Sequence, residues 1–128
     1  MELRIHKGKC HCGAVRFEVR LSGKIEALEC NCSICKMNGY LHIIVPASRF
    51  RLLEGDEALT TYTFNTHTAK HRFCNICGIK SFYIPRSNPH GFSVNLRCLD
   101  RAEFDEINIK QFDGHNWEQN APDLKELT

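Results

Sequence analysis

Apolar and polar residues alternate along several short segments of this chain. Between residues 15 and 21, valine, phenylalanine and leucine at odd positions alternate with arginine and glutamate at even positions. This period of two predicts a strand that buries one of its faces. Further strands are expected where short apolar or β-branched runs lie between turn residues, at 25–30, 41–45, 51–55, 59–64, 69–73, 79–84 and 92–99.

The sequence predicts little helix. After Cys32, Ser33 is placed to cap one helical turn that ends at Asn38-Gly39. Seven or eight short strands with so little helix predict a mainly β fold, built from antiparallel sheets or as an open barrel.

The chain has 128 residues, which is the length of one domain. It contains no linker, repeat or low-complexity tract, so we predict a single domain over residues 1–128. Its core spans about residues 8–100, and a C-terminal tail, residues 101–128, is expected to pack on the sheet. The tail would dock through its apolar residues Ile107, Ile109 and Phe112.

Cysteine is the unusual feature of the composition, with eight in the chain and seven of them in three short clusters. Residues 1–7 contain no apolar stretch typical of a signal peptide, and no run approaches the ~18 apolar residues of a membrane span. We therefore expect a cytoplasmic protein. In a reducing compartment this density of cysteine indicates metal binding rather than disulfide bonds.

Two of the clusters are pairs, Cys10/Cys12 and Cys74/Cys77. Sulfur ligands of a tetrahedral zinc ion lie roughly 3.8 Å apart. A Cys-x-x-Cys turn provides that separation, and a Cys-x-Cys pair provides it in an extended segment, where residues i and i+2 share a face. Together the pairs predict a closed Cys₄ structural zinc site that joins two distant parts of the chain.

The third cluster, Cys30, Cys32 and Cys35, differs in its number of ligands. Three thiolates within six residues can share one ion, and the cluster itself offers no fourth ligand. Three protein ligands plus an exchangeable position are typical of a catalytic zinc ion.

Two residues could fill that fourth position. Cys98 falls on the apolar face of the run 92–99, which favours a role in the core. His42 lies on an expected strand just beyond the cluster, where a hydrogen-bonded neighbour is more common than a ligand. The other histidines that we considered show no ligand spacing and are expected on the surface or in loops: His11, His67, His71, His90 and His115.

The formal charge of +2 gives weak support for an acidic partner. Seven thiolates and two zinc ions would change it by −3, from +2 to −1. A nearly neutral domain does not have the charge of a dedicated nucleic-acid binder.

Three motifs together resemble the glutathione-dependent formaldehyde-activating enzyme family, to which the centromere protein V group also belongs. They are GKCHCGAVRF at 8–17, CNCSIC at 30–35 and RFCNICG at 72–78. The resemblance implies a fold like that of the Mss4 nucleotide-exchange factor. It implies a structural zinc ion on Cys10, Cys12, Cys74 and Cys77 and a catalytic one on Cys30, Cys32 and Cys35.

The resemblance also implies an activity, the reversible condensation of formaldehyde with glutathione to S-(hydroxymethyl)glutathione. The chain is therefore predicted to be a carbon–sulfur lyase with two zinc ions and glutathione as co-substrate. The carboxylates of glutathione need cationic partners, for which the candidates are Lys36, Arg49, Arg72, Lys80, Arg86 and Arg97. Two alternatives stay open. One is a zinc-stabilised binding module for chromatin or protein, and the other is a thiol redox or metal-buffering protein.

Overall fold

The computed structural model describes residues 2–125 and 127–128. Over these residues the chain forms short strands and a few short helices, in the order β1 (Arg4–Lys9), β2 (Arg16–Leu21), β3 (Lys24–Cys30), α1 (Ser33–Asn38), β4 (Leu41–Pro46), β5 (Phe50–Glu54), β6 (Leu59–Tyr62), β7 (Lys70–Cys74), β8 (Phe82–Ile84), β9 (Gly91–Asn95), β10 (Glu106–Phe112), α2 (Trp117–Asn120) and α3 (Pro122–Lys125). Single 3₁₀ turns lie at 47–49, 56–58, 96–98, 101–103 and 114–116.

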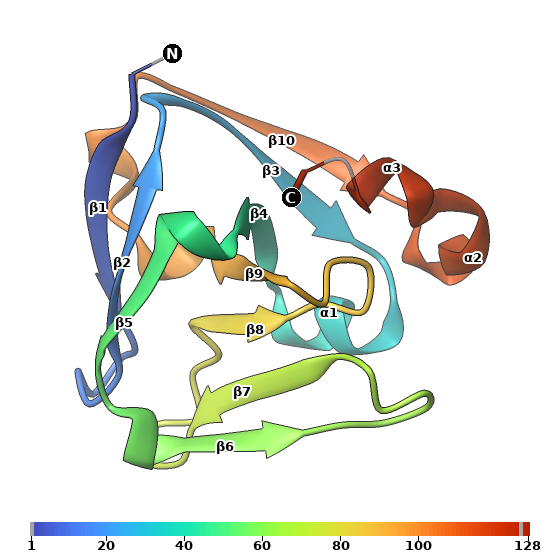
Figure 1. Cartoon of the computed structure of the whole chain (residues 1–128), viewed down its shortest axis with the longest axis horizontal. Coiled ribbons are helices and arrows are strands. Elements are labelled where there is room, and N and C mark those ends of the chain that lie inside the picture. The colour runs from blue at the N-terminus through green and yellow to red at the C-terminus, as the bar shows by residue number, and fades with distance from the viewer. Residues whose placement is uncertain (1, 126) are drawn as a thin grey trace.

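The strands form two open sheets, which confirms the prediction of a mainly β fold. The smaller sheet has the order β1-β2-β5, and the larger one has the order β10-β3-β4-β9-β8-β7-β6. Figure 1 shows the smaller sheet on the left and the larger one extending from β10 and β3 at the top to β6 at the bottom. The pairs are antiparallel except β10 with β3, which is parallel.

The smaller sheet contains both the clearest prediction and a strand that was missed. In β2, Phe17, Val19 and Leu21 are buried while Arg16 and Arg20 are exposed, as the alternation predicted. Strand β1 was not expected, because its sequence RIHKGK has no regular apolar face. It forms an edge of the sheet, held by its antiparallel pairing with β2.

The C-terminal residues add a strand to the larger sheet. β10 pairs with β3 in parallel register from Glu106 opposite Lys24 to Phe112 opposite Cys30. Ile107 packs on the core, whereas Ile109 is exposed. After β10 the chain continues into α2 and α3 at the right of Figure 1.

The larger sheet has one apolar face and one partly polar face. Leu41, Ile43 and Val45 on β4 join the core cluster that also contains Phe17 and Val19 from the smaller sheet. Because successive strand residues point to opposite sides, the even-numbered residues of β4 face away from this core. A pocket lined by His42 and Ile44 lies on that second face.

Three boundary predictions are wrong. The strand expected over 92–99 ends at Asn95, whose side-chain oxygen accepts a hydrogen bond from the Arg97 backbone N–H at 3.1 Å and starts a 3₁₀ turn. The strand expected over 79–84 begins only at Phe82. Ser33 is the first residue of α1 rather than its cap, and no side chain caps this helix. Gly39 ends it in a left-handed conformation, as expected.

None of the helices among the described residues has the length and apolar character that crossing a membrane requires.

Gly55 allows the turn after β5 to approach the first cysteine pair, and this predicts an effect of substitution. Its φ is +97°, and a Cβ there would lie 2.8 Å from the Val15 Cα and closer still to the Ala14 carbonyl oxygen. Gly55→Ala should therefore lower the free energy of unfolding by about 1–2 kcal/mol for the left-handed backbone and by about 1–3 kcal/mol more for overpacking.

Gly39→Ala is the matched control, since Gly39 has φ +63° but nothing lies within 4 Å of the position that a Cβ would take there. Only the left-handed penalty applies to it. Urea denaturation of the zinc-loaded proteins measures the difference, and equal losses in both variants would mean that the approach to residues 14 and 15 is not tight.

Candidate metal centres and the pocket beside them

Four cysteines from distant parts of the chain form one cluster. The Sγ atoms of Cys10, Cys12, Cys74 and Cys77 all lie within 4.8 Å of one another. The Cys12 Sγ is 3.7 Å from that of Cys10 and 3.7 Å from that of Cys74. These separations fit the roughly 3.8 Å between sulfurs in a tetrahedral zinc site, so this cluster could hold a zinc ion.

Two glycine turns shape this cluster. The Gly13 N–H donates to the Cys10 carbonyl at 3.1 Å, and the Gly78 N–H donates to the Cys74 carbonyl at 2.8 Å. Both glycines have positive φ, at +82° and +80°. The expectation that Cys10 and Cys12 project from an extended segment is wrong, because residues 10–13 form a turn. The turn brings their sulfurs together all the same.

The second cluster forms where β3 passes into α1. Cys30 is the last residue of β3, Cys32 precedes the helix, and Cys35 lies within it. Their Sγ atoms lie within 4.8 Å of one another. Soft thiolate ligands favour zinc over harder ions, so these three sulfurs, called here the sulfur triad, could also hold zinc.

The sulfur triad has no fourth ligand within the same range among the described histidine, cysteine, aspartate and glutamate residues. Cys98, the first competitor, is half-buried in the 3₁₀ turn after β9 and packs on the main core cluster. His42, the second, lies in the pocket next to the triad but outside the group of converging ligand atoms.

The C-terminal segment passes closely over the triad. A Cβ at Gly114 would meet the Cys30 Sγ and would come within 2.9 Å of the Cys32 Cβ, so only glycine fits there. Asn31 fixes this contact, because its Oδ1 accepts from the His115 backbone N–H at 3.0 Å and its Nδ2 donates to Asp113 at 3.1 Å. The residue between the first two cysteines of the triad therefore holds the tail in place.

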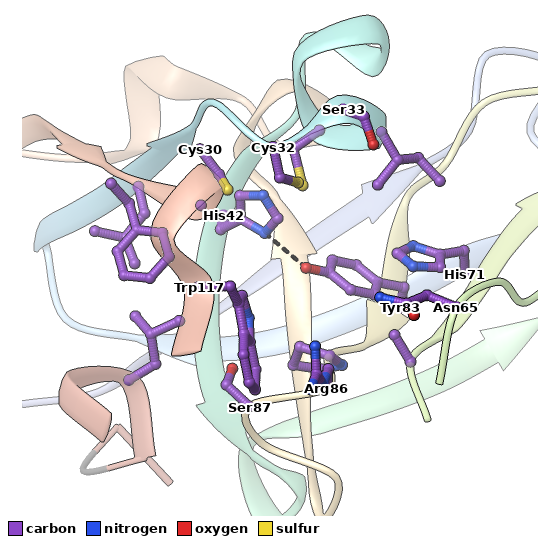
Figure 2. Close-up of a pocket in the computed structure, with 18 of the residues that line it drawn as sticks. Cys30, Cys32, Ser33, His42, Asn65, His71, Tyr83, Arg86, Ser87 and Trp117 are labelled. Atoms are coloured by element: carbon purple, nitrogen blue, oxygen red, sulfur yellow. Dashed lines mark hydrogen bonds between the residues drawn. The ribbon is translucent and has the colours of Figure 1, made fainter. Parts of the chain in front are cut away.

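A pocket of about 320 Å³ opens from the triad. This volume is within the usual range for small-molecule sites. Figure 2 shows Cys30 and Cys32 at its top, His42 and Tyr83 in the middle, and Arg86, Ser87 and Trp117 below. Apolar walls are supplied by Leu28, Ile34, Ile44, Phe64, Pro85, Phe112 and Leu124.

Strand register places the polar residues of the pocket floor. Across β7, β8, β9 and β4, the residues His71, Tyr83, Ser93 and Ile44 are successive partners in one row. His42 is two residues from Ile44 and so lies on the same face. No pattern in the sequence indicated this row, since its members come from four strands whose pairing is decided by the tertiary fold.

The floor is a buried hydrogen-bonded network. The Tyr40 hydroxyl donates to the Ser93 carbonyl at 2.7 Å. The Tyr83 hydroxyl lies 3.1 Å from the His42 Nδ1. Beneath the ring of Tyr83, the Lys80 Nζ lies 4.0 Å from the ring centroid and 2.7 Å from the His71 Nδ1.

Burial determines the charges in this network. Desolvation first, and the charge of Lys80 second, lower the pKa of His42 to about 3 and that of His71 to about 4. Desolvation also lowers the pKa of Lys80 to about 8, although the nearby thiolates of Cys35 and Cys32 act in the opposite direction. At neutral pH both rings are therefore neutral and Lys80 is mostly charged.

Some of the residues singled out from the sequence lie at the pocket, and others do not. His71 was expected on the surface or in a loop, but it is buried on β7. Of the candidate cations, Arg86 lines the pocket, and no other lysine or arginine among the described residues does so. Lys80 lies beneath Tyr83, and the lining does not include the other four candidates, Lys36, Arg49, Arg72 and Arg97.

Arg86 is held in a fixed position at the pocket wall. Its guanidinium carbon lies 3.8 Å from the centre of the Trp117 ring, and its Nη2 donates to Glu118 at 2.8 Å. Asn88, two residues away, is buried and donates to the Leu124 carbonyl at 2.9 Å. The loop after β8 and the C-terminal helices are therefore joined at both Arg86 and Asn88.

Comparison with known proteins agrees with this geometry. The model of the family described as glutathione-dependent formaldehyde-activating enzyme matches residues 5–119, which include all seven clustered cysteines. A crystal structure of a Rhodobacter sphaeroides protein is 41% identical with a TM-score of 0.70, and the match covers 81% of this chain and 99% of that one. On these grounds the chain belongs to the glutathione-dependent formaldehyde-activating enzyme family.

Proposed function

We propose that this protein is a zinc-dependent carbon–sulfur lyase, similar to S-(hydroxymethyl)glutathione synthase. It would condense formaldehyde, or a related aldehyde, with glutathione or a similar small thiol. The observation that supports this best is the sulfur triad, whose three converging sulfurs lie at one end of a pocket without a fourth protein ligand among the described residues. Three protein ligands with one open position are typical of catalytic zinc.

The two cysteine clusters would have different roles. Cys10, Cys12, Cys74 and Cys77 form a complete tetrahedral set, which suits a structural zinc ion. Cys30, Cys32 and Cys35 form an incomplete set beside a pocket, which suits the catalytic ion. Zinc bound by these three thiolates would hold a small thiol in its nucleophilic thiolate form, and would be a weak Lewis acid toward a carbonyl.

The reaction itself needs few steps. The S–H bond of the thiol breaks and an S–C bond forms, while the π electrons of the carbonyl move onto its oxygen. The proton lost from sulfur is restored to that oxygen through solvent, so the product carries a hydroxymethyl group on sulfur. Lys80 offsets part of the negative charge of the thiolates, because its charged amine is buried close to Cys32 and Cys35.

Arg86 is the proposed partner of a substrate carboxylate. It lines the pocket, its guanidinium lies over the Trp117 ring, and its other charged partner is the exposed Glu118. A planar guanidinium pairs with a carboxylate through two parallel hydrogen bonds. Because cytoplasmic thiols are kept reduced, a small thiol acid and a cytoplasmic location agree with this site.

The different roles of the clusters predict different outcomes for two cysteine variants. Cys32→Ala should reduce the zinc content from two ions to one per chain and leave the domain folded. Cys74→Ala should leave it unfolded, because a structural zinc ion contributes about 10–16 kcal/mol in small zinc-binding peptides and a whole domain is stable by only about 5–15 kcal/mol. Elemental analysis and thermal melting measure both effects, and equal thermal losses would contradict the assignment.

The activity predicts faster exchange between free and glutathione-bound formaldehyde. With ¹³C-formaldehyde, exchange spectroscopy should show a rate above the uncatalysed background for the zinc-loaded protein and only the background rate for Cys32→Ala. Cys98→Ala is the matched control, because this thiol lies outside both clusters, and it should retain the wild-type rate within about twofold. A wild-type rate equal to the background would refute the proposed activity and favour a non-catalytic binding module.

The role of Arg86 predicts a selective effect on substrate affinity. Arg86→Met should raise the KM for glutathione about tenfold without changing kcat. A tenfold change in affinity corresponds to about 1.4 kcal/mol, which is close to the contribution of about 1.5–3 kcal/mol from a hydrogen bond to a charged group. Glu118→Gln should lower that KM, because it removes a competing carboxylate. Glutathione diethyl ester is the control substrate. An equal rise in its KM would show that Arg86 does not contact a carboxylate.

A further inference from the structure

His42 has an unpaired nitrogen beside the sulfur triad. The side chain lies on β4 and is only 4% exposed. Its Nδ1 is 3.0 Å from the Ser93 Oγ and 3.1 Å from the Tyr83 hydroxyl. Its Nε2 is buried and has no hydrogen-bond partner among the described residues.

The neighbours of Nδ1 determine which nitrogen carries the proton. A neutral imidazole has one donor and one acceptor nitrogen. The buried Tyr83 hydroxyl has a proton to donate, and the His42 Nδ1 is its one hydrogen-bond partner among the described residues. If Nδ1 accepts this bond, the proton of the ring is on Nε2. The opposite arrangement would leave both the phenol proton and the Nε2 lone pair buried without a partner.

The Nε2–H group is close to where the chemistry would occur. Figure 2 shows the His42 ring between the sulfurs of Cys30 and Cys32 on one side and Tyr83 on the other. A buried donor without a partner is rare in folded proteins and costs free energy. Nε2 has no partner among the described residues, and because His42 lines the pocket, a molecule that enters the pocket can supply the missing acceptor.

We infer that the His42 Nε2–H donates a hydrogen bond to the oxygen on the carbon that becomes attached to the substrate sulfur. This inference rests on the proposed function and makes His42 a catalytic residue of that reaction. The substrate class is a thiol adduct with oxygen on the carbon next to sulfur, as in a hydroxymethyl thioether.

The hydrogen bond strengthens as the reaction proceeds. When the S–C bond forms, the π electrons of the carbonyl move onto oxygen, and that oxygen becomes a stronger acceptor for the fixed N–H group. His42 keeps its own proton throughout, and the oxygen gains its proton from solvent. A donor that is already oriented needs no reorganisation during the reaction.

Tyr83 would act as a positioning residue. Its hydroxyl does not need to touch the substrate, because it fixes Nδ1 as the acceptor and so fixes Nε2–H as the donor. Tyr83 is itself held by the buried Lys80, whose Nζ lies over its ring.

The tautomer can be tested on the unmodified protein. Two-bond ¹H–¹⁵N correlation spectra of the zinc-loaded, ¹⁵N-histidine-labelled chain should show the His42 proton on Nε2. Tyr83→Phe should increase the share of the Nδ1–H form. A wild-type ring with its proton on Nδ1 and a bare Nε2 overturns the inference, because such a nitrogen is an acceptor or a metal ligand.

Two variants test the role of the donor. Asn at position 42 places an amide near the position of Nδ1 but has no group at Nε2, whereas the longer Gln side chain reaches the Nε2 position with an N–H donor. His42→Asn should lower the exchange rate about 10²–10³-fold, as does the loss of one oxyanion donor. His42→Gln should recover at least tenfold of this loss.

Both variants should keep two zinc ions. They should also bind glutathione alone within about twofold of wild type, because glutathione without formaldehyde lacks the oxygen that His42 would contact. Loss of the second zinc ion in His42→Asn would identify His42 as a ligand and overturn the inference, as would an unchanged exchange rate. A wild-type protein with no exchange activity contradicts the proposed function instead. The spectra then still decide whether Nε2 carries the donor proton.

Discussion

The structure depends on the convergence of cysteine sulfurs that lie far apart in the sequence. Thiolates at separations near 3.7 Å repel one another unless a cation lies between them. Backbone groups also hold two of these sulfurs in place, because the N–H groups of Val15 and Ile76 donate to the Sγ atoms of Cys10 and Cys74. A metal at this cluster would fix the β1–β2 connection to the end of β7, and with it the position of the smaller sheet against the larger one.

The packing of the smaller sheet on the larger one also decides which residues lie beside the second cluster. The face toward the smaller sheet is filled by aliphatic and aromatic side chains, among them Phe17, Ile43 and Val94. Because that face packs in the core, strand alternation places His42 and Tyr83 on the opposite face. The triad lies at the edge of that face, where β3 passes into α1. The two faces of the same sheet therefore form the apolar core on one side and the pocket on the other.

The pocket face is unusual because its polar groups are buried almost as completely as the core. Ser93 has no exposed surface, and His42, His71 and Lys80 are each less than a tenth exposed. Such networks are costly unless their groups are paired. Here nearly every group is paired, and the unpaired His42 Nε2 lies beside the triad. The buried Lys80 charge near Cys32 and Cys35 also lowers the electrostatic cost of concentrating negative charge in a low-dielectric site.

The sequence by itself determined the features that depend on short spacing. Alternation identified the strand at Phe17, Val19 and Leu21, Gly39 marked the end of the one predicted helix, and the cysteine spacing identified both clusters. These features were predictable because strand periodicity and local chelation involve residues only a few positions apart. Boundaries such as Asn95 were missed because a side-chain hydrogen bond to the Arg97 N–H overrode the apolar alternation.

Only the tertiary structure decided which distant residues became neighbours. The row of His71, Tyr83, Ser93 and Ile44 depends on the register of four strands. The approach of Gly114 to Cys30 and the stacking of Arg86 on Trp117 depend on the C-terminal segment, whose sequence has the weakest pattern. Strand pairing is set by the total packing of both faces rather than by any local signal, so the cysteines could be found from the sequence but the pocket around them could not.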